Sequence, residues 1–297
     1  MNKEIGVKGF KKVIAVAAMV PSILIGASEV ASAQESQDSS RNTDKIATSV
    51  IGEAWSSENS PFIDVFPNDP YYTGITELNN LGVIEGYKNG SILEFRPNDM
   101  LKRAQFAKII VKALSIPVSE QDISRFKDVE ISGPESFYPD NYIAAAVREG
   151  IIKGKTEEEF GPYEDLTRDQ TATMLIRALS KLPGLLDEIP DGYNSSFNDE
   201  SNIHSENLKK AEYNSLFYGI DLGKNGGTRG ETAQIVFNAL EIISINKWIS
   251  DNGLDKYGNP NGTKYAGGNP LFNEKTGEVT GRYEYILTKH PDKPWTS

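Results

Sequence analysis

Three arginines in this sequence each occupy the first position of an expected α-helix, where a positive charge is unfavourable. They are Arg103, Arg168 and Arg229, and each stands 11 residues before the leucine that closes a helix-spaced apolar run. The positive end of the helix macrodipole lies at that position, so a cation there costs about 0.3–1 kcal/mol. Backbone N–H groups at a helix start favour an anion, and a guanidinium supplies two parallel donors that match a carboxylate. The arrangement therefore indicates up to three carboxylate-binding sites.

The residues next to each arginine determine how the helix would be capped. In a capping box, a Thr or Ser side chain accepts a hydrogen bond from the third helical N–H, and a Gln or Glu at that third position bonds back. The second and third helix starts fit this pattern, whereas the first has Lys102, whose ammonium group cannot accept a hydrogen bond. All of these residues are included in the expected binding sites: Lys102 and Gln105, Thr167 and Gln170, Thr228 and Glu231.

An internal ion pair is the alternative explanation for each arginine. An aspartate lies near the start of each segment that contains an arginine, at Asp64, Asp128 and Asp199. Ion pairs between exposed side chains are common and contribute about 0–1 kcal/mol. Residue spacing leaves both explanations open: an anion site built on the arginine, or a structural pair between the arginine and the aspartate.

The arginines belong to a segment that occurs three times, with the third copy degraded. Each copy contains, in order, a Phe-x-Asp opening, two glycines four residues apart, and the arginine that starts the apolar run. The openings begin at Phe62, Phe126 and Phe197, and the glycine pairs are Gly82/Gly86, Gly150/Gly154 and Gly219/Gly223. Glycine most easily ends a helix in the left-handed conformation, so each copy is expected to form a helix, a turn, a short extended piece and a second helix. One such pair cannot bury its apolar stripe alone, which predicts a three-lobed, mainly helical domain.

The third copy lacks part of the piece between its first glycine and its arginine. That interval is 10 residues long, against 21 in the first copy and 18 in the second. We therefore expect the third site to be incomplete, and we favour Arg103 and Arg168 over Arg229 as binding residues.

Composition and the N-terminus limit the remaining function classes. A formal net charge of −11 argues against nucleic acid or an anionic membrane surface as the main partner. The chain has no cysteine and two isolated histidines, so no metal and no cofactor are predicted. A basic start, an apolar stretch and Ala31-Ser32-Ala33 predict a signal peptide over residues 1–33. No later segment is apolar over the length needed to cross a bilayer, so an exported protein without a membrane span is expected.

Taken together, the Phe-x-Asp-Val opening, the Gly-x-x-x-Gly turn and the Thr-Arg-x-Gln/Glu helix start resemble the S-layer homology domain. The resemblance covers about residues 62–245 and is strongest in the first two copies. It implies three tandem repeats in a pseudo-threefold bundle with grooves between them. It also implies a protein secreted to the cell wall or S-layer of a Gram-positive bacterium, bound to secondary cell wall polysaccharide through a pyruvate-ketal sugar. That sugar carries a carboxylate, the group that the arginines are expected to bind.

The expected organisation follows from the repeats. It comprises a signal peptide (1–33), a flexible linker (34–60), repeats at 61–120, 121–186 and 187–246, the last shortened, and a C-terminal appendage (247–297). The appendage is predicted to be irregular or β, with a surface strand at residues 282–287. We expect a non-catalytic anchor. Two alternatives stay open: an anchored enzyme or toxin-like protein whose effector is the appendage, and a lattice subunit that assembles with other S-layer proteins.

Overall fold

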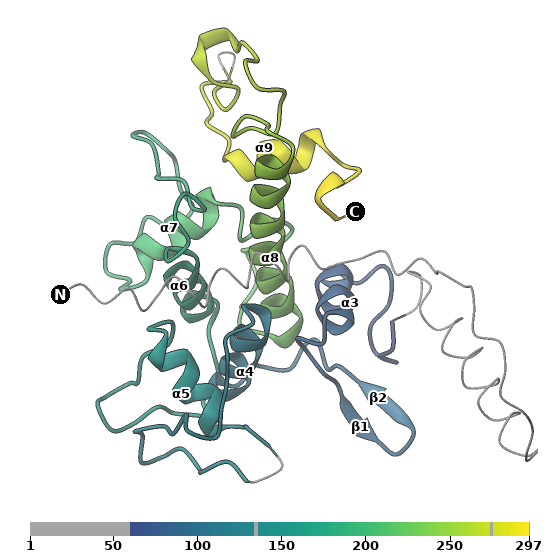
Figure 1. The fold of residues 1–297 in the computed structure, drawn as a ribbon, viewed down its shortest axis with the longest axis vertical. Helices are drawn as coiled ribbons and strands as arrows, with labels where there is room; N and C mark the ends of the chain where they lie inside the picture. The colour runs from purple at the N-terminus through teal and green to yellow at the C-terminus, as the bar shows by residue number, and fades with distance from the viewer. Residues whose placement is uncertain (1–59, 134–135, 274–275, 297) are drawn as a thin grey trace, which may run out of the picture.

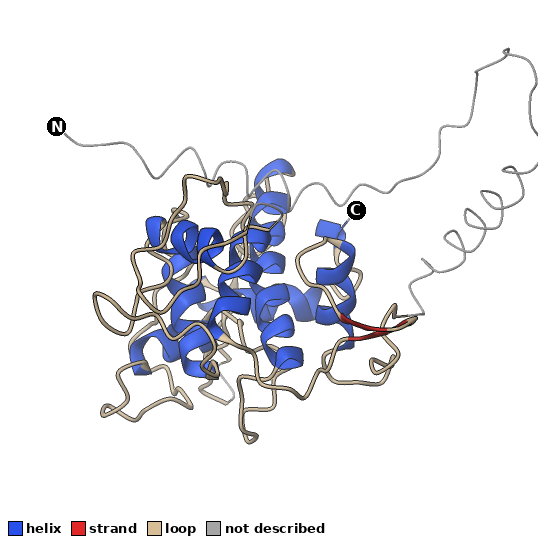
Figure 2. Cartoon of the chain, turned by 90° about the horizontal axis from the view of Figure 1, so that it is seen from below, coloured by secondary structure: helices blue, strands red, loops and turns tan. Residues whose placement is uncertain are grey.

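A computed structural model describes residues 60–133, 136–273 and 276–296 of the chain (Figure 1). The expected signal peptide and almost all of the expected linker lie outside these residues. The described part is mainly helical, as predicted, with a two-stranded antiparallel sheet of β1 (Tyr87–Asn89) and β2 (Ile92–Glu94). Seen from below, the two strands lie at one side of the cluster of helices (Figure 2).

Six helices form three successive pairs, one for each copy of the repeated segment. The pairs are α3 (Tyr72–Asn80) and α4 (Arg103–Ala113), α5 (Asp140–Arg148) and α6 (Arg168–Leu179), and α7 (Ser205–Tyr213) and α8 (Arg229–Asp251). The second helix of each pair begins at the predicted arginine. The short turn η1 (Ala266–Gly268), helix α9 (Arg282–Lys289) and the turn η2 (Pro294–Thr296) follow.

The second helix of each pair packs against the first helix of the next pair. Helix α4 contacts α5, α6 contacts α7, and the long helix α8 returns to contact α3. Figure 1 shows α8 in the middle of the fold, and it also contacts α4 and α6. The apolar side chains of all three pairs form one buried cluster. The apolar stripe that each helix pair would expose alone is therefore covered by its neighbour in a closed cycle.

The two glycines of each turn have different structural roles. The first glycines are left-handed: φ is 68° at Gly82, 64° at Gly150 and 74° at Gly219. This conformation is easily reached only without a side chain. The second glycine of the first two copies lies against the phenylalanine that opens its segment. A Cβ on Gly86 would lie 2.5 Å from the Phe62 ring, and one on Gly154 would lie 2.3 Å from the Phe126 ring.

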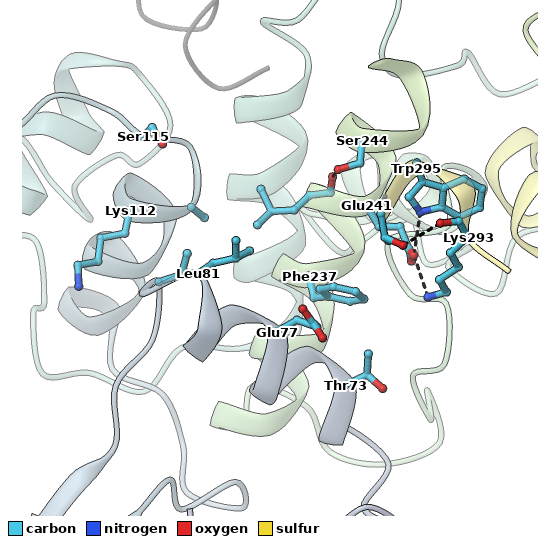
Figure 3. Close-up of a pocket in the computed structure, with 14 residues that line it drawn as sticks. Thr73, Glu77, Leu81, Lys112, Ser115, Phe237, Glu241, Ser244, Lys293 and Trp295 are labelled. Atoms are coloured by element: carbon cyan, nitrogen blue, oxygen red, sulfur yellow. Dashed lines mark hydrogen bonds and ion pairs between the residues drawn. The ribbon is translucent and has the colours of Figure 1, made fainter. Parts of the chain in front are cut away.

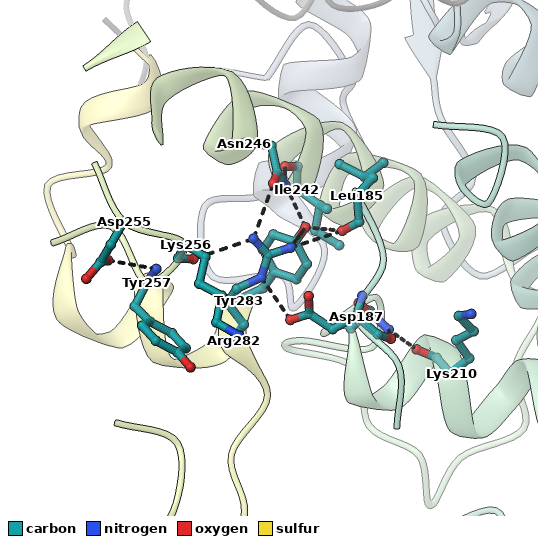
Figure 4. A network of polar contacts seen from close by, with 11 residues as sticks. Leu185, Asp187, Lys210, Ile242, Asn246, Asp255, Lys256, Tyr257, Arg282 and Tyr283 are labelled. Atoms are coloured by element: carbon teal, nitrogen blue, oxygen red, sulfur yellow. Dashed lines mark hydrogen bonds and ion pairs between the residues drawn. The ribbon is translucent and has the colours of Figure 1, made fainter. Parts of the chain in front are cut away.

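The C-terminal appendage is helical where a strand was predicted. Residues 282–287 belong to α9, so the predicted surface strand is wrong, and Arg282 and Tyr283 are buried. The Tyr283 hydroxyl donates to the carbonyl oxygen of Leu185, and Arg282 Nε lies 2.8 Å from a carboxylate oxygen of Asp187 (Figure 4). The alternating aromatic residues of this segment suggested a strand, but contacts with the connector between α6 and α7 decide its conformation. The appendage is thereby attached to the third helix pair.

Candidate functional site

Arg103 extends from the start of α4 into the second repeated segment. Its Nε donates to the carbonyl oxygen of Phe160 (3.0 Å) and its Nη2 to that of Lys153 (3.2 Å), which precedes the second glycine of the turn. The guanidinium carbon lies 4.8 Å from the centre of the Phe160 ring, and the side chain is buried. A contact between segments therefore accounts for a cation at this helix start.

Arg229 makes the same contacts between α8 and the first segment. Its Nε donates to the carbonyl oxygen of Phe95 (2.8 Å) and its Nη2 to that of Glu85 (3.3 Å). Glu85 occupies the position in the first glycine turn that Lys153 occupies in the second. The guanidinium carbon lies 4.6 Å from the centre of the Phe95 ring and 4.7 Å from that of Tyr87. Helix α8, the last of the three pairs, thus contacts the first repeated segment and closes the cycle.

Arg168 differs from the other two because it has a carboxylate partner. Its Nη2 lies 2.7 Å and its Nε 2.9 Å from the two carboxylate oxygens of Glu231, and both residues are buried. It also donates to carbonyl oxygens of the third glycine turn, those of Asp221, Leu222 and Lys224. This arginine is neutralised inside the protein by an acid of the next segment.

The alternative explanation, an ion pair between each arginine and an opening aspartate, is wrong. Asp64 accepts the N–H of Phe95 (2.7 Å), and Asp128 accepts the N–H of Phe160 (2.9 Å). Asp199 accepts hydrogen bonds within its own turn. The first two aspartates therefore hold the loops whose carbonyl oxygens receive an arginine from another segment.

The first N–H groups of α4 and α8 are occupied by backbone carbonyl oxygens. The donor and acceptor pairs are Arg103 to Glu164, Ala104 to Pro162, Arg229 to Asp99 and Gly230 to Pro97, at 2.8–3.1 Å. The expectation that these N–H groups are free for an anion is therefore wrong. Any anion at these helix starts has to be bound by side chains.

The capping box is complete at α6 and different at α4. In α6 the Thr167 hydroxyl accepts the Gln170 N–H (3.2 Å), and the Gln170 side chain accepts the Thr167 N–H (3.4 Å). In α4 the Gln105 side chain accepts the Lys102 N–H (3.0 Å), while the Lys102 ammonium pairs with Asp165 at 2.5 Å. Lys102 thus forms an exposed ion pair with the second segment.

The capping box predicted at α8 is half formed. The Thr228 hydroxyl accepts the Glu231 N–H at 3.3 Å. The Glu231 carboxylate, however, accepts from the Gly227 N–H (3.1 Å) and from Arg168. Glu231 therefore acts as the internal counter-ion of a neighbouring arginine, a role that the capping pattern did not predict.

Arg103 and Arg229 are buried cations that form no ion pair with any residue the structure describes. Burial lowers the pKa of both guanidinium groups. Burial also acts to lower the pKa of Arg168, but the hydrogen bond to Glu231 and the negative charges around the guanidinium together outweigh burial, and the pKa is raised. Carbonyl oxygens and aromatic faces compensate a buried guanidinium less completely than a carboxylate does. An anion placed beside Arg103 or Arg229 would therefore be stabilising.

A pocket of about 220 Å³ adjoins Arg229. Its lining comprises turn residues 83–87, Gln105, Lys108 and Ile109 of α4, Tyr138 and Arg229. Gln105 donates to the Tyr87 hydroxyl (2.9 Å), and the Lys108 ammonium lies 3.0 Å from the Glu85 carboxylate. The pocket combines two cations, one carboxylate (Glu85, paired with Lys108), two tyrosines and an amide at a contact between segments. Such a set can bind a carboxylate together with a sugar ring.

The pocket contains two of the predicted site residues, Arg229 and Gln105. Arg103 and Arg168 do not line it, so the geometry favours the arginine that the sequence ranked last. Lys108 was not predicted, although it lies one helical turn after Gln105 on the same face of α4, and that spacing could have found it. Arg103, Lys102, Arg168 and Glu231 lie at contacts between segments. Thr167, Gln170 and Thr228 cap their own helix starts.

Fold and site together define a helical repeat protein with a cationic pocket between repeated segments. Within the described ranges no helix is both long and apolar enough to cross a membrane. The S-layer homology domain family matches residues 61–107 and 125–172 of the chain. The chain therefore contains S-layer homology domain sequence in these two segments. The third copy lies outside the matched residues, so the number of three repeats stays a prediction.

Relatives of this chain include an enzyme and surface-layer proteins. It is 32% identical over 196 residues to an endoglucanase of Bacillus sp. (strain KSM-635), covering 64% of this chain and 20% of the endoglucanase. It is 28% identical over 169 residues to the S-layer protein EA1 of Bacillus anthracis (54% and 18%), and 38% identical over 104 residues to the surface-layer 125 kDa protein of Lysinibacillus sphaericus (35% and 8%). The matches cover a fifth or less of each relative. Family and relatives agree with the predicted location, secreted to the cell wall or S-layer of a Gram-positive bacterium.

Proposed function

We propose that this protein attaches non-covalently to the cell envelope by binding an anionic secondary cell wall polysaccharide in the pocket beside Arg229. A carboxylate of the glycan, such as that of a pyruvate-ketal sugar, would lie between Arg229 and Lys108. The sugar ring would lie against Tyr87 and Tyr138. Because the whole chain is acidic, with a net charge of −11, attraction has to come from these local donors rather than from the overall field.

The observation that carries the proposal is a buried guanidinium without a carboxylate partner at the wall of a pocket. A buried charge is strongly destabilising unless it is compensated. Arg229 has two carbonyl oxygens and two aromatic faces as partners, and Lys108 adds a second positive charge to the same pocket. A bound carboxylate would supply the missing negative charge through charge-assisted hydrogen bonds.

The cyclic contacts support a pseudo-threefold arrangement of three repeats. The arginine at each second helix donates to the glycine turn of the next segment, and the cycle closes from Arg229 to Glu85. The third segment follows this pattern although it is shorter. Its turn contacts Arg168, which carries its own counter-ion, so the glycan-binding role is assigned to the pocket at Arg229.

The described domain is proposed to act as an anchor without catalysis. The match to the endoglucanase covers 20% of that protein, which leaves most of the enzyme outside the similarity. Attachment of different partners through one shared segment explains why relatives with enzyme names and with S-layer names both match this chain.

Co-sedimentation with purified Gram-positive cell walls tests the proposal. Binding should be lost when the non-peptidoglycan polysaccharide is stripped from the walls. A free pyruvate-ketal sugar should compete for binding, and the same sugar without the ketal should not. Lys108→Ala should weaken binding about five- to tenfold, equivalent to about 1–1.4 kcal/mol.

The matched control is Lys127→Ala, which removes an exposed lysine that pairs with Glu158 and does not line the pocket. Its binding should equal that of the unmodified protein. Equal binding to stripped and intact walls, or an unaffected Lys108→Ala variant, would refute the assignment.

A further inference from the structure

A second pocket, of about 470 Å³, lies between α3, the end of α4 and α8, with the turn η2 at one end (Figure 3). Residues one helical turn apart form its two long walls. They are Thr73 and Glu77 on α3 with Leu81 directly after it, and Phe237, Glu241 and Ser244 on α8. Pockets of about 300–1,000 Å³ are typical of small-molecule sites. Arg229 and Lys108 do not line this pocket, so it is separate from the proposed glycan site.

Glu77 is the charged group in this pocket that has no hydrogen bond or ion pair from its side chain to any described residue. Glu241, facing it from α8, is paired with Lys293 at 2.8 Å. Lys112, at the end of α4, is paired with a carboxylate outside the pocket at 2.8 Å. Burial raises the pKa of Glu77, opposed by the positive charge of Lys293. The pocket therefore contains one negative charge, that of Glu77, without an ion-pair partner.

The rest of the lining is largely apolar. Val83, Ala113 and Leu240 line the pocket together with Leu81 and Phe237. The Lys293 ammonium lies 5.6 Å from the centre of the Phe237 ring, so this part of the pocket already accommodates an ammonium group over an aromatic face. We propose that this pocket binds a small amphiphilic amine, with its apolar body against Leu240 and Phe237 and its ammonium group on Glu77.

Charge distinguishes this ligand class from others of the same size. An anion would lie near the unpaired carboxylate of Glu77, which repels it. A neutral ligand would displace water from Glu77 and leave its charge uncompensated, which is unfavourable. An ammonium group satisfies the carboxylate through a charge-assisted hydrogen bond.

Isothermal titration calorimetry of the full-length chain with three six-carbon probes at pH 7 tests the proposal. Hexylammonium should bind saturably at one site, hexan-1-ol at least about tenfold more weakly, and hexanoate not at all. Glu77→Gln should weaken hexylammonium binding about tenfold and leave hexan-1-ol unchanged. The control Glu120→Gln removes an exposed glutamate outside the pocket and should leave the affinity for hexylammonium unchanged.

Three results would overturn the proposal: no saturable binding of hexylammonium, hexan-1-ol binding as tightly as hexylammonium, or Glu77→Gln binding the amine as the unmodified chain does. The comparison of probes uses the unmodified chain and does not depend on how a variant folds. Lys108→Ala should bind hexylammonium normally, so this test is independent of the proposed attachment to the wall.

Discussion

The carboxylate of Glu231 occupies the place that a backbone carbonyl oxygen takes at the other two arginines. The Nε of Arg168 donates to Glu231 at 2.9 Å, whereas the Nε of Arg103 donates to the Phe160 carbonyl and that of Arg229 to the Phe95 carbonyl. The loop that would supply a carbonyl is absent from the shortened third segment. A side chain of α8 replaces it, and the replacement neutralises Arg168.

Glu231→Gln should therefore destabilise the fold strongly. It leaves the Arg168 guanidinium buried without a counter-ion, at an expected cost of about 3–5 kcal/mol. Urea unfolding measures the change. The control Glu158→Gln breaks an exposed pair with Lys127 and should cost less than about 1 kcal/mol. Similar losses of unfolding free energy in the two variants would show that the buried Arg168–Glu231 pair contributes no more than the exposed Lys127–Glu158 pair.

Gly86→Ala should destabilise the first segment because the new Cβ has no room. It would lie 2.5 Å from the Phe62 ring and 2.7 Å from the Glu94 carbonyl oxygen. Overpacking of this kind costs about 1–3 kcal/mol. At Gly223, the equivalent position of the third segment, the nearest contact is a flexible Asp221 oxygen at 3.3 Å. Thermal unfolding should show a lower midpoint for Gly86→Ala and little change for Gly223→Ala; the reverse order would contradict the packing.

Asp128→Asn should reduce stability near neutral pH and much less in acid. Burial acts to raise the pKa of Asp128, but hydrogen bonds from the Gly161 and Phe160 N–H groups outweigh it, and the pKa is lowered. A carboxylate with a lowered folded-state pKa stabilises the fold above its unfolded value, about 3.9, and loses that effect as the pH falls toward the folded value. Urea unfolding between pH 7 and pH 3 should show the difference from the unmodified protein shrinking below about pH 5. A difference that stays constant over this range would be inconsistent with the pKa shift.

Glu85→Gln should strengthen attachment to the wall. Its carboxylate pairs with Lys108 (3.0 Å) and Lys112 (2.8 Å) and places a negative charge beside the proposed glycan pocket. Removing that charge frees Lys108 for the ligand, with an expected gain of about two- to fivefold in affinity. Co-sedimentation with intact walls measures it. Weaker binding by this variant would argue that Glu85 contacts the ligand directly.

Tyr283→Phe should destabilise the C-terminal appendage and the third helix pair together. The buried hydroxyl donates to the Leu185 carbonyl oxygen and accepts from Asn246 Nδ2 and Arg282 Nη2. Its removal breaks these buried hydrogen bonds, at a cost of about 1–3 kcal/mol. Tyr285→Phe is the matched control, because the Tyr285 hydroxyl has no hydrogen bond to a described residue and its side chain is half-buried. Equal unfolding midpoints for the two variants would mean that α9 is not part of the cooperative unit.

Local sequence pattern was sufficient for the helices and their ends. The apolar spacing and the left-handed glycines Gly82 and Gly150 are properties of neighbouring residues, so the second helices were predicted to begin at the arginines and do so. The conformation of residues 282–287 was predicted wrongly because their alternation of aromatic residues resembles a strand. Contacts with Leu185 and Asp187, almost a hundred residues earlier, determine it.

The sequence by itself determined the repeated unit, the family and the unusual position of three cations. Only the tertiary structure decided which partner each cation has, since Arg229 meets the Glu85 carbonyl across 144 residues and Arg168 meets Glu231 across 63. The physical reason is the closed cycle of helix pairs. Each arginine is satisfied by a segment other than its own, so no local spacing could show that Arg168 is neutralised while Arg229 stays uncompensated beside a pocket.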